Sequence, residues 1–440
     1  MTTVAPDDPA AARGIGRRVQ SDIYRAGISG ARPAVPVHPD ALERAARRAL
    51  SAEAFVYIQG GAGTGRTMDA NRAAFARRQV WPRPLRDVSS RDLSTTFLGR
   101  TRPTPLLLAP LGVMELAHAQ ADLAVARAAA SLGIPYVLSN QASFPMEQVA
   151  HEAPAGPRLF QLYWSSSDEL NASLLRRAEA SGCEAIVVTL DTHLLGWRTQ
   201  DLDLAYLPFT RGLGIAQYTS DPVFQQLVRE RARASADQPA ARVRMTAKTV
   251  AAGVSMARKT RGITGAGVRD GLRSPLPRVA VETFLDVFST PALTWDDLPK
   301  ARAWTSLPIL LKGIVHPDDA VRAMDAGLDG VWVSNHGGRQ IDDAVPTLDV
   351  LEKIVARVDG RAPVVFDSGV RGGADAFIAL AMGATAVAIG RPYAYGLAVA
   401  GEDGVREVMR NILAELDITL GLSGHTAIAE VTRDAIRDVP

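Results

Sequence analysis

The feature that most constrains the fold of this chain is a series of eight short apolar runs after residue 104. Most of the runs are separated by amphipathic stretches of about a dozen residues, as in βα units. Nearly continuous apolar strands that alternate with helices indicate a parallel sheet covered on both faces. The predicted strands span 105–110, 135–140, 158–164, 184–191, 308–313, 330–335, 363–369 and 386–391.

Eight such units in sequence are typical of the α/β class and favour a (β/α)8 TIM barrel. An open, doubly wound sheet uses similar units and is the alternative. The barrel is favoured because polar residues gather at the C-terminal end of every run, where barrels carry their active sites. We therefore predict an N-terminal arm and helical segment over 1–104 and a barrel over 105–440.

One connection is much longer than the others. It covers 205–290, between the fourth and fifth runs, and its middle is basic, rich in Ala and poor in large apolar residues. Such a segment cannot form a core of its own, so we expect a lid or a loop that orders on oligomerisation. A solvated insertion without a function is the alternative.

Composition excludes several classes of function. The net charge is +2 over 440 residues, so the charge gives no indication of nucleic-acid binding. No run reaches the roughly 18 apolar residues of a membrane span, and the N-terminus lacks an apolar signal region. The single cysteine, Cys183, is expected in the core and favours a reducing compartment, so we predict a cytoplasmic protein. None of the seven His has H-E-x-x-H spacing, and no metal is expected.

Every apolar run ends in polar side chains or glycines. Each of these residues alone could be a helix cap or a surface charge, but a barrel brings all eight strand ends to one mouth. In chain order they are Gly112; Ser139 and Gln141; Gln161 and Tyr163; Thr189, Asp191 and, further on, Arg198; Lys312; Ser334, His336 and Arg339; Asp367, Gly369 and Arg371; Gly390 and Arg391.

The last two strand ends predict an anion site. Glycine-rich turns lead into helix N-termini there, with Arg371 and Arg391 beside them, at the usual phosphate position of a barrel. Other strand ends offer hydrogen bonds across a wide floor, which suits a large planar heterocycle better than a sugar phosphate. These floor residues are Ser139, Gln161, Thr189 and Lys312.

A base and two cations are expected above that floor. The guanidinium groups of Arg198 and Arg339 match one carboxylate, and a neutral His336 could take a proton from a neighbouring hydroxyl. Asp191 could hold the imidazole in one tautomer and stabilise the cation that develops. The predicted substrate is a 2-hydroxy carboxylic acid, oxidised at its carbinol carbon.

Six short motifs resemble the FMN-dependent L-α-hydroxy acid oxidase family, over about residues 40–435. They are FQLY at 160–163, TLDT at 189–192, LLKG at 310–313, SNHGGRQ at 334–340, FDSGVRGGAD at 366–375 and IGRP at 389–392. Within the family, LGWRTQDL, KGIVHPDDA and GRPYAYG are most similar to the lactate monooxygenase branch.

The resemblance implies FMN as cofactor and a small, lactate-like 2-hydroxy acid and O2 as substrates. A monooxygenase of this family keeps peroxide in the site, where it decarboxylates the keto acid. A simple oxidase instead releases the keto acid and the peroxide. The alternative to a lactate-like monooxygenase is such an oxidase acting on a larger or more polar acid. The resemblance further implies a homotetramer or an octamer, with no nucleic-acid or membrane partner.

The resemblance also implies roles for individual residues. His336 resembles the catalytic base and Asp191 its partner, and Lys312 would stabilise the reduced flavin. The substrate groups would be Tyr57, Tyr163, Arg198 and Arg339. The flavin would be held by Ala109, Pro110, Gly112, Ser139, Gln161, Thr189, Lys312 and Ser334, its ribityl chain by Asp367, and its phosphate by Gly369, Arg371, Gly390 and Arg391.

Two positions depart from the family pattern. Gln141 stands where several members carry an aromatic or another apolar residue in the substrate pocket, which puts lactate itself in question. Gly112 stands where some oxidases carry Ala beside the flavin. The alternatives to a flavin enzyme are a sugar-phosphate aldolase or isomerase with Lys312 as Schiff base, and a flavin-binding relative without activity.

Overall fold

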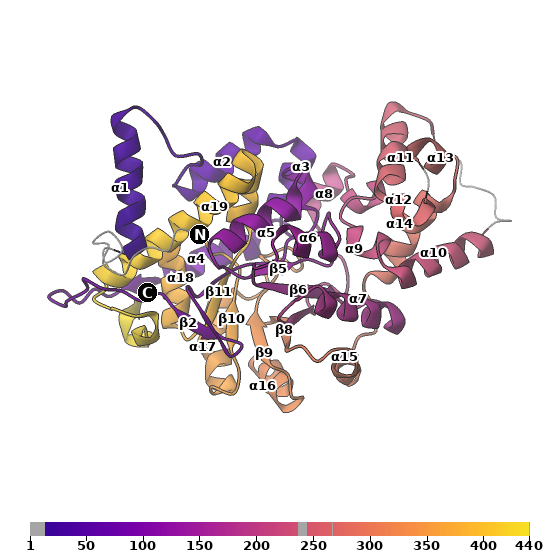
Figure 1. Cartoon of the computed structure of the whole chain (residues 1–440). Helices are drawn as coiled ribbons and strands as arrows, with labels where there is room; N and C mark the ends of the chain where they lie inside the picture. Colours follow the sequence, from indigo (N-terminus) through magenta and orange to yellow (C-terminus); the bar gives the residue numbers. More distant parts are fainter. Residues whose placement is uncertain (1–13, 236–243, 266, 440) are drawn as a thin grey trace.

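The structure is a computed structural model that describes residues 14–235, 244–265 and 267–439 (Figure 1). The first 13 residues of the predicted arm lie outside this range. So do residues 236–243 and 266 of the predicted insertion.

Eight parallel strands form a closed barrel, so the predicted (β/α)8 architecture is confirmed and an open sheet is wrong. The last strand pairs with the first, with Val387 opposite Leu106 and Ile389 opposite Leu108. Each of the eight predicted runs overlaps one strand of the barrel. The strands are β4 (Leu106–Leu108), β5 (Tyr136–Leu138), β6 (Arg158–Tyr163), β7 (Ile186–Thr189), β8 (Ile309–Ile314), β9 (Gly330–Val333), β10 (Val364–Phe366) and β11 (Ala386–Ile389).

The strands are apolar throughout because both of their faces are buried. Side chains that point into the barrel, such as Leu107, Val187 and Trp332, form an interior cluster. Phe97 joins this cluster from the hairpin of β2 (Thr95–Phe97) and β3 (Arg100–Arg102). Alternate residues such as Leu106 belong to a second, larger cluster with the surrounding helices.

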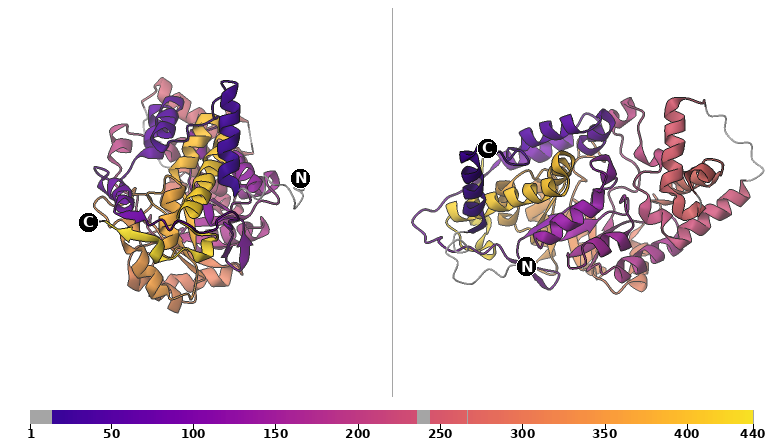
Figure 2. Two further views of the ribbon diagram at one scale, coloured as in Figure 1. Left: turned by 90° about the vertical axis from the view of Figure 1, so that its left-hand side faces the viewer. Right: turned by 45° about the horizontal axis from the view of Figure 1, so that its top comes forward.

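Helices follow the strands and surround the barrel (Figure 2). They are α5 (Ala121–Ser131), α6 (Met146–Glu152), α7 (Asp168–Ala180), α15 (Leu298–Trp304), α16 (Pro317–Asp325), α17 (Thr347–Val358), α18 (Gly373–Ala381) and α19 (Arg391–Leu422). Helix α19 is kinked at Ala400 and Gly401, whose backbone angles are not helical.

The N-terminal segment packs against the barrel. Its helices are α1 (Gly14–Ile28), α2 (Pro39–Ala49), α3 (Ala52–Gln59) and α4 (Arg66–Ala76). Helices α1 and α2 both pack against α19 (Figure 1). Strand β1 (Arg78–Val80) pairs with β12 (Ile436–Asp438), which ties this segment to the C-terminus.

The predicted insertion is largely helical and gathers at one side of the molecule (Figure 1). After α8 (Thr199–Asp203), its elements are η3 (Pro208–Arg211), α9 (Ala216–Thr219), α10 (Pro222–Ala234), α11 (Ala247–Lys259), α12 (Arg261–Thr264), α13 (Val268–Gly271) and α14 (Leu276–Val287). Phe224 and Phe284 of these helices are fully buried in the larger cluster, so the insertion shares the core of the barrel. Within the described ranges, no helix is long and apolar enough to cross a membrane.

Candidate active site

A pocket opens at the C-terminal ends of the barrel strands. It encloses about 1050 Å³ not filled by protein atoms, part of it open to solvent. The lining includes fifteen of the predicted site residues: Tyr57, Ala109, Pro110, Gly112, Gln141, Tyr163, Arg198, Lys312, His336, Arg339, Asp367, Gly369, Arg371, Gly390 and Arg391. The other five predicted residues, Ser139, Gln161, Thr189, Asp191 and Ser334, do not line it but lie at the ends of strands β5, β6, β7 and β9.

The loop after β9 turns sharply because three consecutive residues adopt left-handed backbone angles. His336, Gly337 and Gly338 have φ of 58°, 64° and 75°. At Gly338 a Cβ atom would lie 2.7 Å from the backbone nitrogen of Met68 in α4, so only glycine fits. Gly338 therefore lets the His336 loop pack closely against the N-terminal segment.

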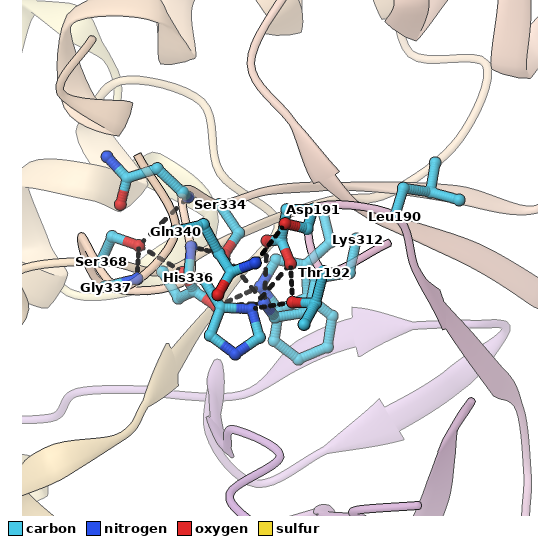
Figure 3. A network of polar contacts seen from close by, with 12 residues as sticks. Leu190, Asp191, Thr192, Lys312, Ser334, His336, Gly337, Gln340 and Ser368 are labelled. Atoms are coloured by element: carbon cyan, nitrogen blue, oxygen red, sulfur yellow. Dashed lines mark hydrogen bonds and ion pairs between the residues drawn. The ribbon is translucent and has the colours of Figure 1, made fainter. Parts of the chain in front are cut away.

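His336 and Asp191 form a hydrogen-bonded pair (Figure 3). The Nδ1 atom of His336 lies 2.7 Å from Oδ1 of Asp191. Thr192 fixes the same carboxylate, since its hydroxyl donates to Oδ1 at 2.9 Å. Because a carboxylate only accepts hydrogen bonds, Nδ1 carries the hydrogen in the neutral ring, and Nε2 is left with a free lone pair.

The charges around this pair favour an ionised acid and a neutral base. Burial alone would raise the pKa of Asp191, but its interactions with His336 and Lys312 and the hydrogen bonds from His336 and Thr192 hold it well below its usual range. Burial lowers the pKa of His336, against the attraction of Asp191. A neutral imidazole beside a carboxylate is the arrangement of a general base.

Lys312 is buried between two carboxylates. Its Nζ lies 3.6 Å from Asp191 and donates to the hydroxyl of Ser334 at 2.9 Å (Figure 3). It also lies 3.8 Å from Asp367. A Schiff-base lysine needs a free amine. These contacts therefore argue against the aldolase alternative.

Two arginines and a tyrosine lie together at the same mouth. Arg198 donates to the side chain of Gln340 at 3.1 Å, and Arg339 donates to the carbonyl of Gly60 at 2.7 Å. The guanidinium carbon of Arg339 lies 5.4 Å from the ring centre of Tyr57. Neither arginine forms an ion pair within the described part of the chain.

Burial, and then the positive charge of Arg198, lower the pKa of Arg339. Asp201 attracts both arginines but forms no ion pair with either, so part of the cost of placing the two cations together remains. A bound carboxylate would relieve it, so the geometry supports the predicted carboxylate clamp.

The other end of the pocket combines Gly390 with two further arginines. At Gly390 a Cβ atom would have only Leu111 within reach, at 4.0 Å, so the backbone at the start of α19 faces open space. The guanidinium of Arg371 donates only to the carbonyl of its neighbour Val370, as far as the described residues show. This end of the pocket can hold an anion, as was predicted from the glycines and arginines of the sequence.

The motif predicted that Arg391 binds the phosphate, but in the structure its side chain forms hydrogen bonds to backbone carbonyls. Its guanidinium donates at 3.0 Å to the carbonyls of Gln59, Gly60 and Gly337. It thus joins the end of α3, which carries Tyr57, to the His336 loop.

Buried polar atoms at the floor of the barrel fit a flat hydrogen-bonding ring. Nε2 of Gln161 and Oγ1 of Thr189 are buried without a hydrogen-bond partner among the described residues. Each such atom costs about 1–3 kcal/mol unless a ligand satisfies it. A flavin ring would supply the missing partners, so these residues fit FMN.

We expect Thr189→Val to separate cofactor binding from stability. Valine has the same shape and removes the unsatisfied hydroxyl, so the FMN-free protein should melt at the same or a higher temperature. FMN affinity should fall about 5- to 10-fold, the effect of roughly 1 kcal/mol. Titration of the apoprotein with FMN and thermal melts would measure both.

Thr283→Val is the matched control for this prediction. Its hydroxyl donates to the carbonyl of Val279 within α14, and Thr283 does not line the active-site pocket. This variant should lose stability and keep FMN affinity. Equal FMN affinity in Thr189→Val and the natural protein would contradict the predicted role of Thr189.

Several residues of the site were not identified from the sequence. Gln340 donates to the carbonyls of Asp191 and Leu194, and it accepts from Arg198. Asn71 and Asn335 exchange a reciprocal pair of amide hydrogen bonds at 2.9 Å, which holds α4 to the His336 loop. Thr192 and Gln340 stood within recognised motifs, but only the fold shows what they contact.

Comparison with known proteins agrees with the site. A family model for FMN-dependent dehydrogenases matches residues 46–438. An L-lactate oxidase of Lysinibacillus sphaericus is 40% identical over 392 residues, 88% of this chain and 89% of that protein. A 4-hydroxymandelate oxidase of Amycolatopsis orientalis is 37% identical over 392 residues, 89% of this chain and 96% of that protein.

Solved structures show the same fold. A mandelate oxidase with (S)-4-hydroxymandelic acid aligns with a TM-score of 0.73 at 34% identity, covering 91% of this chain and 98% of that one. A mandelate oxidase variant with a C4a-OH-FMN adduct aligns with a TM-score of 0.70 at 34% identity, covering 89% and 96%. The family, the barrel and FMN as the cofactor predicted from the motifs are therefore confirmed, and this chain belongs to the FMN-dependent dehydrogenase family.

Proposed function

We propose that the protein oxidises an L-2-hydroxy acid to the 2-oxo acid with His336 as the base. The observation that carries this proposal is the 2.7 Å contact of Nδ1 with Asp191, which leaves Nε2 as the proton acceptor in a pocket shared with Arg198 and Arg339. The oxidase relatives support the same reaction.

Each residue has a definite task in this reaction. Arg198, Arg339 and Tyr57 bind the substrate carboxylate and orient the molecule. Nε2 of His336 takes the hydroxyl proton while the C–O bond becomes a carbonyl, and Asp191 stabilises the imidazolium that forms. Bound FMN would supply the two-electron acceptor for the hydride from the carbinol carbon and would pass the electrons to O2. Lys312 would place a positive charge near the electron-accepting ring.

The fate of peroxide distinguishes two forms of the function. The relatives named as oxidases support release of the keto acid and peroxide. Retention of peroxide, with decarboxylation of the keto acid, is the alternative form and would need the site to stay closed after the oxidation. Product analysis with labelled acids in air tests this: keto acid plus peroxide indicates an oxidase, and a shortened acid plus carbon dioxide a monooxygenase. Absence of both product pairs for every acid would contradict the proposed function.

The pH dependence tests the protonation state of the base. The pKa of His336 is lowered from its ordinary value of about 6.5, chiefly by burial. A base must be neutral, so kcat/KM should be level above pH 6.5 and should fall about tenfold per pH unit once the pH drops below that lowered pKa. Steady-state or anaerobic rates from pH 5 to 8 would show whether the rate begins to fall only below pH 6.5. An inflection above pH 6.5 would contradict a neutral buried base.

A further inference from the structure

Two phenylalanines of the insertion line the active-site pocket. Phe209 lies in η3 and Phe288 directly follows α14. Neither contributes a polar group, and neither has a role in the proposed proton transfer or in the carboxylate clamp. They lie more than 75 residues apart in the chain yet reach the same cavity.

Each phenylalanine packs edge-on against a tyrosine of the pocket. The ring centres of Phe209 and Tyr57 are 6.5 Å apart with an interplanar angle of 85°. Those of Phe288 and Tyr163 are 6.4 Å apart, also at 85°. The insertion therefore places one ring beside each of the two tyrosines predicted to contact the substrate.

Both phenylalanines rest on a third ring, Phe284, which is fully buried. Its centre lies 5.1 Å from that of Phe209 and 5.2 Å from that of Phe288. Tyr218 packs against Phe284 at 4.8 Å, and its hydroxyl accepts a hydrogen bond from Asn140 of the barrel at 2.8 Å. The two pocket rings are thus fixed through Phe284 and Tyr218 to the end of β5.

The chemistry of a 2-hydroxy acid leaves one substituent without a binding site. The carboxylate is matched by the arginines, the hydroxyl by His336, and the hydrogen leaves as hydride. The side chain of the acid must meet the rest of the lining, which includes Met114, Leu195, Phe209 and Phe288 beside the amide of Gln141. Apolar surface favours apolar substituents by about 25 cal/mol per Å² buried.

We infer that Phe209 and Phe288 form the subsite for the substrate side chain, and that they select 2-hydroxy acids whose side chain is apolar and larger than a methyl group. This inference rests on the proposed function and names its substrate class. It gives the insertion a defined role, because the insertion supplies the apolar wall of the pocket. If the two rings served only to pack the core, they would not be expected to line the cavity. Phe284, which packs in the same cluster, does not line it.

Binding of carboxylates without a hydroxyl group tests the subsite separately from turnover. Propionate and 3-phenylpropionate would be titrated into the FMN-loaded protein, with the flavin absorbance as the readout. The natural protein should bind 3-phenylpropionate at least 10-fold more tightly than propionate. Phe288→Ala and Phe209→Ala should each remove most of this preference, because they weaken binding of 3-phenylpropionate far more than binding of propionate. Phe288→Leu and Phe209→Leu, which keep more of the packing, should show an intermediate preference and serve if an alanine variant does not fold.

Phe224→Leu is the matched control. This residue is buried in the same insertion and packs against Tyr218, at 5.5 Å between ring centres, but it does not line the pocket. It should keep the full preference for 3-phenylpropionate. Loss of preference in Phe224→Leu equal to that in the pocket variants would show a general effect of loosening the insertion and would contradict a specific subsite.

The remaining outcomes distinguish the inference from the proposed function. An unchanged preference in all pocket variants, or a tighter fit of 3-phenylpropionate in Phe288→Ala, would overturn the inference. If lactate still reduced the flavin of those variants, the proposed function would stand. If no 2-hydroxy acid, small or large, reduced the flavin of the natural protein, the proposed function would fail and the substrate class with it.

Discussion

His336→Ala is expected to bind FMN with normal affinity and to lose flavin reduction by about 10²–10⁴-fold or more. The ring contributes its Nε2 lone pair to the pocket, and the Asp191 contact at 2.7 Å sets which nitrogen accepts the proton. Alanine removes the base without adding bulk. Stopped-flow mixing with a 2-hydroxy acid in the absence of oxygen measures the rate of flavin reduction directly.

His193→Ala is the control for the loss of His336. His193 lies in the loop after β7, exposed, with its Nδ1 3.2 Å from the carbonyl of Leu190, and it does not line the active-site pocket. Its removal should leave the reduction rate within a few-fold of the natural protein. Reduction by His336→Ala at a near-normal rate would refute its assignment as the base, whatever the control shows.

Arg339→Lys is expected to weaken substrate binding on the order of 100-fold, with a smaller change in the rate of the bound complex. A guanidinium forms two parallel hydrogen bonds to a carboxylate, and an ammonium cannot form that planar pair. A loss of about 2–3 kcal/mol, typical of hydrogen bonds between charged groups, corresponds to this factor. Lysine would also lose the contacts of Arg339 with Gly60 and the Tyr57 ring.

The dependence of the anaerobic reduction rate on acid concentration separates binding from chemistry for Arg339→Lys. Arg66→Lys is its control, since Arg66 pairs with Asp343 on the surface near the same loops and both side chains are more than 60% exposed. That variant should bind substrate normally. Unchanged substrate affinity in Arg339→Lys would count against the clamp.

The barrel could be predicted because its strands are buried on both faces. Each of the eight runs is apolar at consecutive positions, since residues such as Leu107 face the interior and their neighbours face the helices. Polar residues at the C-terminal ends of those runs then marked the mouth, and the fold brings His336, Arg198 and Arg339 to one pocket as the sequence indicated.

Contacts between distant segments could not be predicted in this way. Phe209 and Phe288 belong to an insertion whose composition gave no periodic signal for the pocket, and only its packing on Phe284 directs them there. The pairing of Asn71 with Asn335 depends on the approach of α4 to the barrel, which no local pattern encodes. The tetramer or octamer and the cytoplasmic location stay predictions, because neither is a property of one folded chain.

The most direct test of the central claim is anaerobic mixing of the FMN-loaded protein with a panel of L-2-hydroxy acids, each with hydrogen or deuterium at the carbinol carbon. We expect bleaching of the flavin absorbance by at least one acid and a slower rate with deuterium, since that C–H bond breaks in the step that His336 assists. Absence of bleaching with every acid in the panel would contradict the claim that this pocket joins a base, a carboxylate clamp and FMN for the oxidation of a 2-hydroxy acid.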